Sequence, residues 1–243
     1  YGVYLRQRGR TILTLTLDRA IQFFEISPPL YETLQRMIIL QHDGSQVYSP
    51  LTGFRPGWDI TIPTYRNYSD IQAMQQRLAG KQTQRTIVGY FQGTFKPTEP
   101  RYGHGYRSKL WHLAQQHPNS FYVRNGHSEL YWHELRMARW ALCPEGWVPW
   151  SPRFYDALQV GSMPLILSER WLPPKAIRRF VNERVGLTEM DQLPEILSKL
   201  PRAIPTWVAL AVRWQVPAQP GDAFHQLMAE LADRLNANNL PDL

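Results

Sequence analysis

The sequence predicts an α/β protein whose second part contains a Rossmann-type, doubly wound parallel sheet. From residue 85 onward, short runs rich in β-branched and aromatic residues alternate with amphipathic segments of helical period. Such alternation is typical of βαβ units that build a parallel sheet. The chain has 243 residues, 43% of them hydrophobic and 19% charged, which is sufficient for a sizeable core and ordinary for a folded globular protein.

The elements of the second part follow one another at regular intervals. The sequence predicts strands at residues 86–91, 120–125, 139–144 and 163–168, separated by helices at residues 105–116, 128–138 and 151–161. After Pro173 it predicts a helix, a short strand around residues 184–187 and three further helices ending near Asn236. We therefore expect a Rossmann-like domain over residues 85–243.

The first part is less regular. Residues 11–26 suit a strand, a short helix and a second strand, and residues 32–44 suit a helix that leads into a buried strand ended by Gly44. A long loop at residues 45–58, a short strand at 59–65, a helix at 69–78 and a linker at 80–84 complete it. We expect residues 1–84 to form a separate N-terminal α/β domain.

Charge and cysteine content narrow the function classes. The net charge of +7 suits nucleic acid, an anionic membrane, an acidic polymer or a phosphorylated small molecule as a partner. Cys143 is the only cysteine, which excludes an intrachain disulfide and a cysteine-based zinc site and favours a reducing compartment. No apolar run is long enough for a transmembrane helix, no signal peptide is evident, and the chain begins at a tyrosine.

The segment from Ser151 to Asp156 joins a predicted buried strand to a predicted helix. Ser151 is a favourable N-cap, Pro152 suits the first helical position, and Gly161 suits a left-handed residue after the helix. Parallel sheets bind ligands at the carboxyl ends of their strands, where a helix N-terminus favours an anion. Arg153 adds a positive charge, and Asp156 offers a carboxylate to vicinal hydroxyls on the same helix face. The three polar residues therefore suit a nucleoside diphosphate.

The same residues also permit a purely structural interpretation. Ser-Pro is a common way to begin a helix, and Arg153 and Asp156 are spaced as an ordinary surface pair. The local chemistry leaves both interpretations open.

Several stretches around this segment resemble the signature of the exostosin family, glycosyltransferase family 47. LCPEGW, SPRFYDAL and VGSMPLIL are similar to the family's Cys-Leu-x-Pro-x-Gly strand end, its Ser-x-Arg-hydrophobic-x-Glu-Ala helix start and its Pro-Val strand. IVGYFQGTF and ERWLPP resemble the family's flanking segments, and TLDRAIQFF and WDITIPTY resemble two upstream ones. The resemblance covers most of residues 14–200 and is strongest from 85 to 175.

The chain departs from the family pattern at three points. Asp156 stands where the family usually has Glu, which shortens the reach of the carboxylate, and Ser162 stands where it usually has Cys. The part before residue 85 is also shorter than the family's acceptor domain.

The resemblance implies a GT-B-like architecture, with a Rossmann-type donor domain and a shortened acceptor domain. It implies an inverting enzyme that transfers a sugar from a nucleoside diphosphate sugar, with a UDP-sugar expected, and that needs no metal or other cofactor. Ser151 and Arg153 would then contact the diphosphate, and Asp156 the ribose. Arg107, in YGHGYRSKL, is a second candidate diphosphate ligand or else an exposed helix residue. Residues 144–147, including Glu145 and Gly146, would line the base pocket or simply pack the loop.

The catalytic base is expected on the acceptor side of the cleft. His42 and Asp43 follow a predicted buried strand, and either could accept the proton of a hydroxyl. The alternative is that Asp43-Gly44 is merely a turn. Asp59 is a further candidate.

Two other function classes stay open beside the glycosyltransferase. The Asp156 departure and the short first part motivate a catalytically inactive, exostosin-like glycan-binding or partner subunit, and the basic charge motivates a nucleic-acid-binding protein. The favoured partners are a nucleotide sugar and a glycan acceptor without nucleic acid, and peripheral membrane association and a homo- or heterodimer stay open. The single cysteine favours a cytoplasmic, bacterial-type enzyme, with the Golgi lumen as the alternative if an anchor has been removed.

Overall fold

The described part of the chain forms two compact units. The computed structural model describes residues 4–7, 10–14, 37–47, 53–64, 68–79, 84–96, 98–99, 102–178, 181, 184–200, 227 and 229–233. The first unit comprises Tyr1–Thr64, Arg170–Asn182 and Trp214–Leu243, and the second comprises Tyr65–Glu169 and Glu183–Arg213. These units interleave along the sequence. The predicted consecutive domains, 1–84 and 85–243, stay a prediction.

The first unit contains a four-stranded sheet in the order β1-β2-β3-β4. β1 (Tyr4–Gln7) pairs antiparallel with β2 (Arg10–Thr14), while β2, β3 (Met37–Gln41) and β4 (Ile60–Thr61) run parallel. Its core joins apolar side chains of β3 and β4 to Leu231 in the helical residues 229–233. The strands predicted near residues 11, 40 and 60 are confirmed, and residues 15–36, with the helices predicted there, lie outside the described residues.

The second unit contains a fully parallel sheet in the order β6-β5-β7-β8. The strands are β5 (Ile87–Gly93), β6 (Phe121–Asn125), β7 (Ala138–Pro144) and β8 (Met163–Leu167). Every residue of β8 and all but one of β7 are buried, as expected for strands covered on both faces. The four predicted strands of the regular part are thus confirmed within one or two residues.

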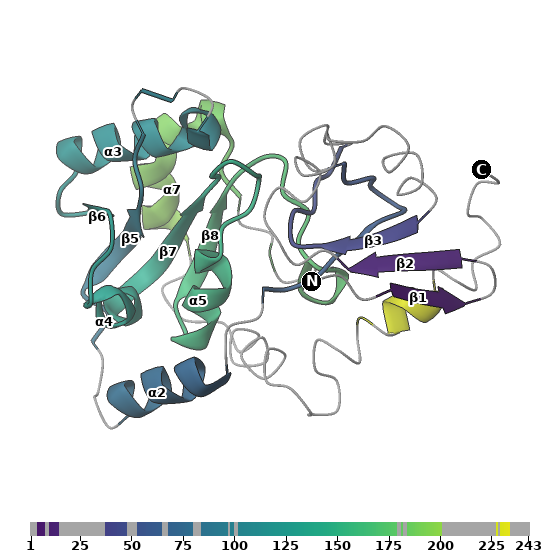
Figure 1. The fold of residues 1–243 in the computed structure, drawn as a ribbon. Coiled ribbons are helices and arrows are strands. Elements are labelled where there is room, and N and C mark those ends of the chain that lie inside the picture. The colour runs from purple at the N-terminus through teal and green to yellow at the C-terminus, as the bar shows by residue number, and fades with distance from the viewer. Residues whose placement is uncertain are drawn as a thin grey trace. The chain divides into compact units, whose positions relative to one another are not determined.

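Helices cover both faces of this sheet. Figure 1 shows α3 (Tyr106–Gln116) and α7 (Leu193–Lys199) on one face, and α4 (Tyr131–Met137) and α5 (Arg153–Gln159) on the other. α2 (Tyr68–Leu78) belongs to the same unit and α6 (Lys175–Arg178) to the first, while two 3₁₀ segments cover Tyr102–Gly105 and Leu187–Gln192. Where a short strand is predicted near residue 184, the described residues make an isolated parallel bridge between Arg184 and Ile166.

The strand order places a topological switch point in the second unit. β5 lies between β6 and β7, so the connection after β5 leads to one side of the sheet and the later strands extend from the other. Ligands of open α/β sheets bind at the carboxyl ends of the strands on either side of such a point. The residues to examine are therefore those that follow Gly93 of β5 and Pro144 of β7.

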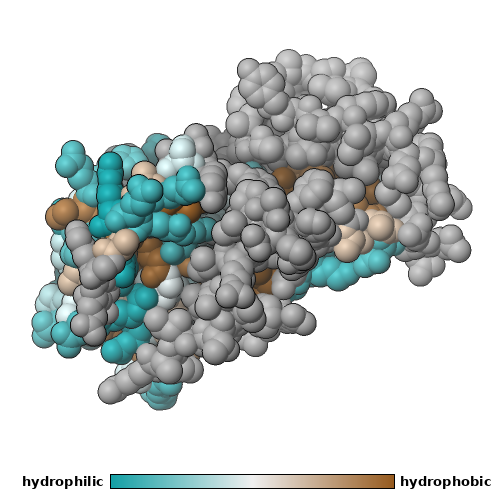
Figure 2. All heavy atoms as spheres, turned by 90° about the horizontal axis from the view of Figure 1, so that it is seen from below, coloured by the Kyte–Doolittle hydropathy of each residue, from teal (hydrophilic) through white to brown (hydrophobic). Residues whose placement is uncertain are grey.

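The described surface of the second unit is mixed in character. Figure 2 shows small hydrophobic areas among hydrophilic ones on the face seen from below. Such mixing is usual for a folded protein, since apolar atoms make up much of any protein surface. Among the described helices, none has the length and apolar character that crossing a membrane requires.

Candidate functional site

The start of α5 differs from the prediction in the role of Ser151. α5 begins at Arg153, with Pro152 at the N-cap position and no side chain capping the helix. The Ser151 hydroxyl instead accepts a hydrogen bond from Nη1 of Arg153 (3.1 Å). The predicted N-cap is therefore wrong, because a charged guanidinium is a stronger donor than a helix N–H and occupies the hydroxyl. Gly161 has the predicted left-handed conformation, with φ of 73°.

Arg153 is a buried cation. Its side chain is 7% exposed, its Nη2 donates to the main-chain oxygen of Gln92, and its guanidinium lies 4.3 Å from the centre of the Phe91 ring. Its Nε is also buried, with no hydrogen-bond partner among the described residues, and none of their carboxylates forms an ion pair with it. A buried positive charge without a counter-ion is costly, and a bound anion would remove that cost.

A glycine makes this position of Arg153 possible. Gly93 ends β5, and a Cβ atom there would lie 3.0 Å from Nη2 of Arg153 and 3.0 Å from the Phe91 ring. That separation is tighter than a normal contact, so any larger residue would displace the guanidinium or the ring. The FQG sequence at the end of β5 thus supplies the ring, the carbonyl and the space that Arg153 uses.

Asp156 lies beside Arg153 in the wall of a cavity. Its side chain is 2% exposed and its Oδ2 accepts a hydrogen bond from the Tyr131 hydroxyl (2.8 Å). The cavity has a volume of about 880 Å³, in the range of small-molecule sites. It lies among the end of β5, the turn after β6 and the starts of α4 and α5, and its wall includes Arg153, Asp156, Gln92, Gly93, Tyr131 and Trp132.

Arg107 is not an exposed helix residue. Its Nε donates to the main-chain oxygen of Glu145 (2.8 Å), and its Nη1 donates to Thr94 O (2.8 Å) and to the Tyr102 hydroxyl (2.5 Å). Burial, together with the charge of nearby Arg153, lowers the pKa of Arg107 to about 10, and Tyr102 opposes this shift. Arg107 is thus still charged at neutral pH. It is not part of the cavity wall, so its contact with a diphosphate stays a prediction.

The two predicted arginines nevertheless share one aromatic ring. The guanidinium carbon of Arg107 lies 5.5 Å from the centre of the Phe91 ring, on which Arg153 also packs. Two cations at one ring concentrate positive charge near the carboxyl end of β5. Sequence reasoning missed Phe91 as the support for both, although its place in the FQG stretch was visible.

Glu145 and Gly146 lie in a tightly packed loop after β7. The Glu145 side chain is 1% exposed, with Oε1 accepting from the Ser168 hydroxyl (2.5 Å) and Oε2 lying 3.0 Å from Nδ1 of His104. The carbonyl of Gly146 accepts a hydrogen bond from the N–H of Gly103 (2.9 Å). Neither residue belongs to the cavity wall, so their part in base binding stays a prediction.

His42 and Asp43 lie in the first unit, directly after β3. His42 is 5% exposed with Nδ1 3.1 Å from the carbonyl oxygen of Ile62, and Asp43 is fully buried. The chain here is not a simple turn, because Gly44 O accepts from Leu172 N (3.0 Å) and Ser45 forms an antiparallel bridge with Trp171. A Cβ on Gly44 would lie 2.2 Å from the carbonyl oxygen of Leu172, which explains the glycine. A role as base stays a prediction for both side chains.

Asp59, the remaining candidate base, is fully engaged in structure. It is 3% exposed and accepts hydrogen bonds from the N–H of Ile39 (3.0 Å) and from the N–H, Nε and Nη2 of Arg55 (2.8, 3.0 and 2.7 Å). This carboxylate anchors the loop of residues 55–59 to β3. We assign it no catalytic role.

The sequence of this chain is similar to those of known proteins. A family model described as the Exostosin GT47 domain matches residues 9–185. The chain belongs to the exostosin GT47 family. The probable beta-1,4-xylosyltransferase IRX10L of Arabidopsis thaliana is 32% identical over 220 residues, which are 83% of this chain and 51% of that protein. A probable glucuronosyltransferase of Oryza sativa subsp. japonica is 33% identical over 224 residues, which are 83% of this chain and 50% of that protein.

Family membership confirms the resemblance and the α/β fold with a parallel sheet, in keeping with a GT-B-like glycosyltransferase. The chain spans about half the length of the curated relatives it matches. Both relatives are plant proteins, which gives no support to the expected cytoplasmic, bacterial-type location. Among the described residues no three His, Cys, Asp or Glu side chains gather as metal ligands would, and independence of metal stays a prediction.

Proposed function

We propose that this protein is a glycosyltransferase that transfers a sugar from a nucleoside diphosphate sugar, a UDP-sugar, to a hydroxyl of a glycan. The observation that carries the proposal is Arg153, a buried cation without a carboxylate partner among the described residues, in the wall of a cavity of about 880 Å³. Relatives whose names describe xylosyl and glucuronosyl transfer support the same chemistry.

The diphosphate of the donor would lie against Arg153. The Nε of this side chain lacks a protein acceptor among the described residues, and the N–H groups at the start of α5 add further positive potential. Asp156 lies in the same wall and can accept hydrogen bonds from the ribose hydroxyls, with Tyr131 fixing the orientation of its carboxylate. Arg107 would add its charge from the start of α3.

The reaction exchanges one carbon–oxygen bond for another. The bond between the anomeric carbon and the diphosphate oxygen breaks, the acceptor oxygen bonds to that carbon from the opposite face, and the acceptor proton passes to a base. Negative charge grows on the leaving diphosphate, so Arg153 binds the transition state more strongly than the ground state. His42 and Asp43 remain the candidates for the base, to be separated by individual substitution.

The names of the relatives suggest which donors to test first. One relative is described as a probable xylosyltransferase and another as a probable glucuronosyltransferase. UDP-xylose and UDP-glucuronate are therefore the first donors, with GDP-sugars as the comparison for the base. Such relatives also make the Golgi lumen the compartment that we propose for this enzyme.

The decisive experiment measures thermal stabilisation by UDP and GDP in the wild-type protein, in Arg153→Ala and in Lys199→Ala. Lys199 is an exposed cation of the same unit, paired with Glu195, and serves as the control for loss of a charge. A ligand at 100 times its Kd stabilises the folded state by about 2.7 kcal/mol. We expect UDP to raise the melting temperature of the wild type and of Lys199→Ala but not of Arg153→Ala. If neither UDP nor GDP raises the melting temperature of the wild-type protein, the proposal is overturned.

A second candidate function rests on Asp156. This residue is shorter than the glutamate usual in the family, and it is already engaged with the hydroxyl of Tyr131. An inactive, glycan-binding member of the family would bind oligosaccharide without transferring sugar. Product analysis by mass spectrometry with UDP-xylose, UDP-glucuronate and β-1,4-linked xylohexaose separates the two candidates, because only the enzyme lengthens or decorates the oligosaccharide.

A further inference from the structure

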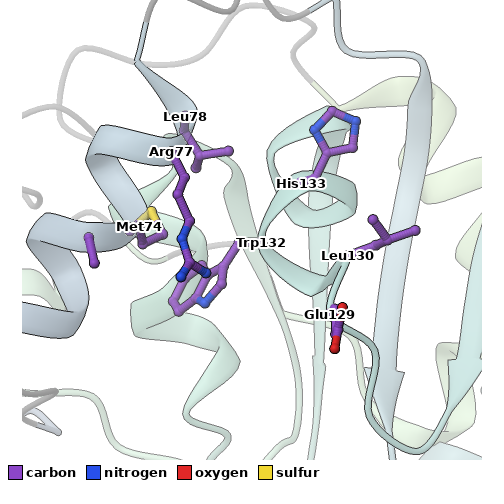
Figure 3. A pocket seen from close by; sticks show the side chains of 8 residues that line it. Met74, Arg77, Leu78, Glu129, Leu130, Trp132 and His133 are labelled. Atoms are coloured by element: carbon purple, nitrogen blue, oxygen red, sulfur yellow. The ribbon is translucent and has the colours of Figure 1, made fainter.

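A second cavity adjoins the first in the second unit. It has a volume of about 530 Å³ and lies between α2 and the start of α4, with Met74, Arg77 and Leu78 on one side and Leu130, Trp132 and His133 on the other (Figure 3). Arg77, Glu129, Leu130 and Trp132 line both cavities. The two cavities therefore meet at these residues, and we call them together the α2–α4 groove, with Arg153 and Asp156 in its larger part only.

The smaller part of the groove combines an apolar floor with polar edges. Met74 and Leu78 are 5% and 9% exposed and form the floor, while Arg77, Glu129 and His133 are exposed at the edges. Figure 3 shows the Arg77 side chain extending from α2 toward the indole of Trp132. The smaller part of the groove thus offers a cationic, an anionic and an imidazole group in addition to an aromatic ring.

This combination matches the chemistry of a sugar ring. A pyranose presents a face of C–H groups that packs on an aromatic ring and an edge of hydroxyls that need both donors and acceptors. Trp132 offers the ring, Arg77 offers donors and Glu129 offers acceptors. Leu130 is 54% exposed where the two parts meet, an apolar contact that a bound chain would cover.

We propose that the α2–α4 groove binds the acceptor as an oligosaccharide of several sugar units, with Trp132 as the ring on which one unit packs. The inference rests on the proposed function. That function places the reacting ends of donor and acceptor in the larger part of the groove. Sugar units beyond the reacting end then occupy the smaller part, on the far side of Leu130 and Trp132 from Arg153. The groove consequently selects long acceptors over short ones.

The test compares Trp132→Ala with Trp111→Ala. Trp111 is a 37% exposed tryptophan on α3 of the same unit that lines neither cavity, so it controls for loss of an indole. Binding of β-1,4-linked xylohexaose and xylobiose is measured by isothermal titration calorimetry, and binding of UDP by thermal stabilisation. We expect Trp132→Ala to weaken xylohexaose binding about tenfold or more, as loss of a packed aromatic ring does, and to reduce the UDP shift far less.

Each contrary result has a distinct meaning. Unchanged xylohexaose affinity in Trp132→Ala, equal losses for xylohexaose and xylobiose, or no binding of xylohexaose to the wild type would overturn the proposal. Loss of the UDP shift in a folded Trp132→Ala protein would show that the ring binds the nucleobase instead. Trp132→Phe keeps a ring and guards against a folding defect, and it should retain most of the affinity. Failure of the proposed function appears separately, as absence of a UDP shift in the wild type.

Discussion

Two arginine–aspartate sets, one in each unit, differ in how fully their hydrogen bonds are made. In the first unit, Asp59 accepts four hydrogen bonds, three of them from Arg55, whose guanidinium carbon also lies 5.3 Å from the centre of the Trp58 ring. In the second unit, Arg153 donates to a carbonyl and a hydroxyl and pairs with no carboxylate among the described residues. The first set is internally neutralised, whereas the second retains its positive charge.

The difference separates structural charge from functional charge. A buried ion pair whose partners satisfy each other has no capacity left for a ligand, so its contribution is to hold the loop in place. A buried cation that remains unpaired beside a cavity costs stability, a cost typical of sites that gain their counter-ion only when a ligand binds. Residue type is the same in both sets, and Arg55 is partly exposed whereas Arg153 is buried. The partners decide which role each set has.

The largest expected effect is on stability, at Asp59. Asp59→Ala leaves the partly exposed guanidinium of Arg55 and the N–H of Ile39 without their acceptor. Breaking a buried pair in this way typically costs about 3–5 kcal/mol. We expect a loss of that size in the free energy of unfolding measured with urea, with the UDP-induced shift preserved in the folded protein.

The control for this prediction is Glu195→Ala, which breaks the exposed Glu195–Lys199 pair of α7. Exposed pairs contribute little, so this variant should unfold close to the wild type. An equally small loss in Asp59→Ala would show that the Arg55–Asp59 set does not anchor its loop.

Removing the charge of Arg153 should have a large effect on nucleotide affinity and little effect on stability, the reverse of what we expect at Asp59. Arg153→Met keeps an unbranched, apolar side chain on Phe91 but removes the charge. We expect nucleotide affinity to fall roughly 10- to 100-fold, since a hydrogen bond to a charged group contributes about 1.5–3 kcal/mol. The free energy of unfolding should not decrease, since an unpaired buried cation has been removed. Calorimetry and urea denaturation on one preparation measure both quantities.

A decrease in unfolding free energy as large as that of Asp59→Ala would contradict this prediction. It would show that Arg153 holds the start of α5 in place rather than waiting for an anion. Arg153→Lys sharpens the result, because it keeps the charge but loses the fork of donors, and it should recover only part of the affinity.

A substitution of Tyr131 tests whether Asp156, the aspartate beside Arg153, contacts the nucleotide. Tyr131→Phe removes the hydroxyl that donates to Oδ2 of Asp156 and changes little else. A hydrogen bond to a charged group contributes about 1.5–3 kcal/mol, so a nucleotide held by an Asp156 that has lost this hydrogen bond should bind about tenfold more weakly. Unchanged UDP affinity would mean that Asp156 does not contact the nucleotide.

The regular part of the second unit was predictable from sequence because its signals are local. Strand composition and helical period placed β5 to β8 within one or two residues, and Gly161 indicated the end of α5 correctly. Arg153 and Asp156, whose spacing predicts one helix face, line the same cavity. Each of these features depends on residues close together in the chain.

What sequence reasoning missed depends on contacts between distant residues. Ser151 fails as a cap because of a guanidinium that Gln92 and Phe91 hold in place, some 60 residues earlier in the chain. Tyr131 gave no recognisable signal, since its importance arises only when α4 packs beside α5. Asp59 seemed a candidate base because a sequence does not show that one aspartate already has four donors.

The smallest predicted effect is the pH dependence of the Arg55–Asp59 set. Burial raises the pKa of Asp59 above its ordinary value of 3.8, although the hydrogen bonds and charge of Arg55 act against the shift. An acid with a raised pKa binds its proton more tightly in the folded state. Its contribution to stability is therefore full below pH 3.8 and is lost as the pH rises through the folded pKa, with a slope of at most about 1.4 kcal/mol per pH unit.

Asp59→Asn removes this titration and retains an acceptor oxygen. The free energy of unfolding of the wild type relative to Asp59→Asn should therefore fall as the pH rises from 4 toward neutrality in urea titrations. A relative free energy that increases with pH would place the folded pKa below 3.8, and the donors of Arg55 would then outweigh the burial of the carboxylate. The sign of this pH dependence therefore shows how far the donors of Arg55 satisfy the carboxylate of Asp59. Such mutual satisfaction is the property that distinguishes the Arg55–Asp59 set from Arg153.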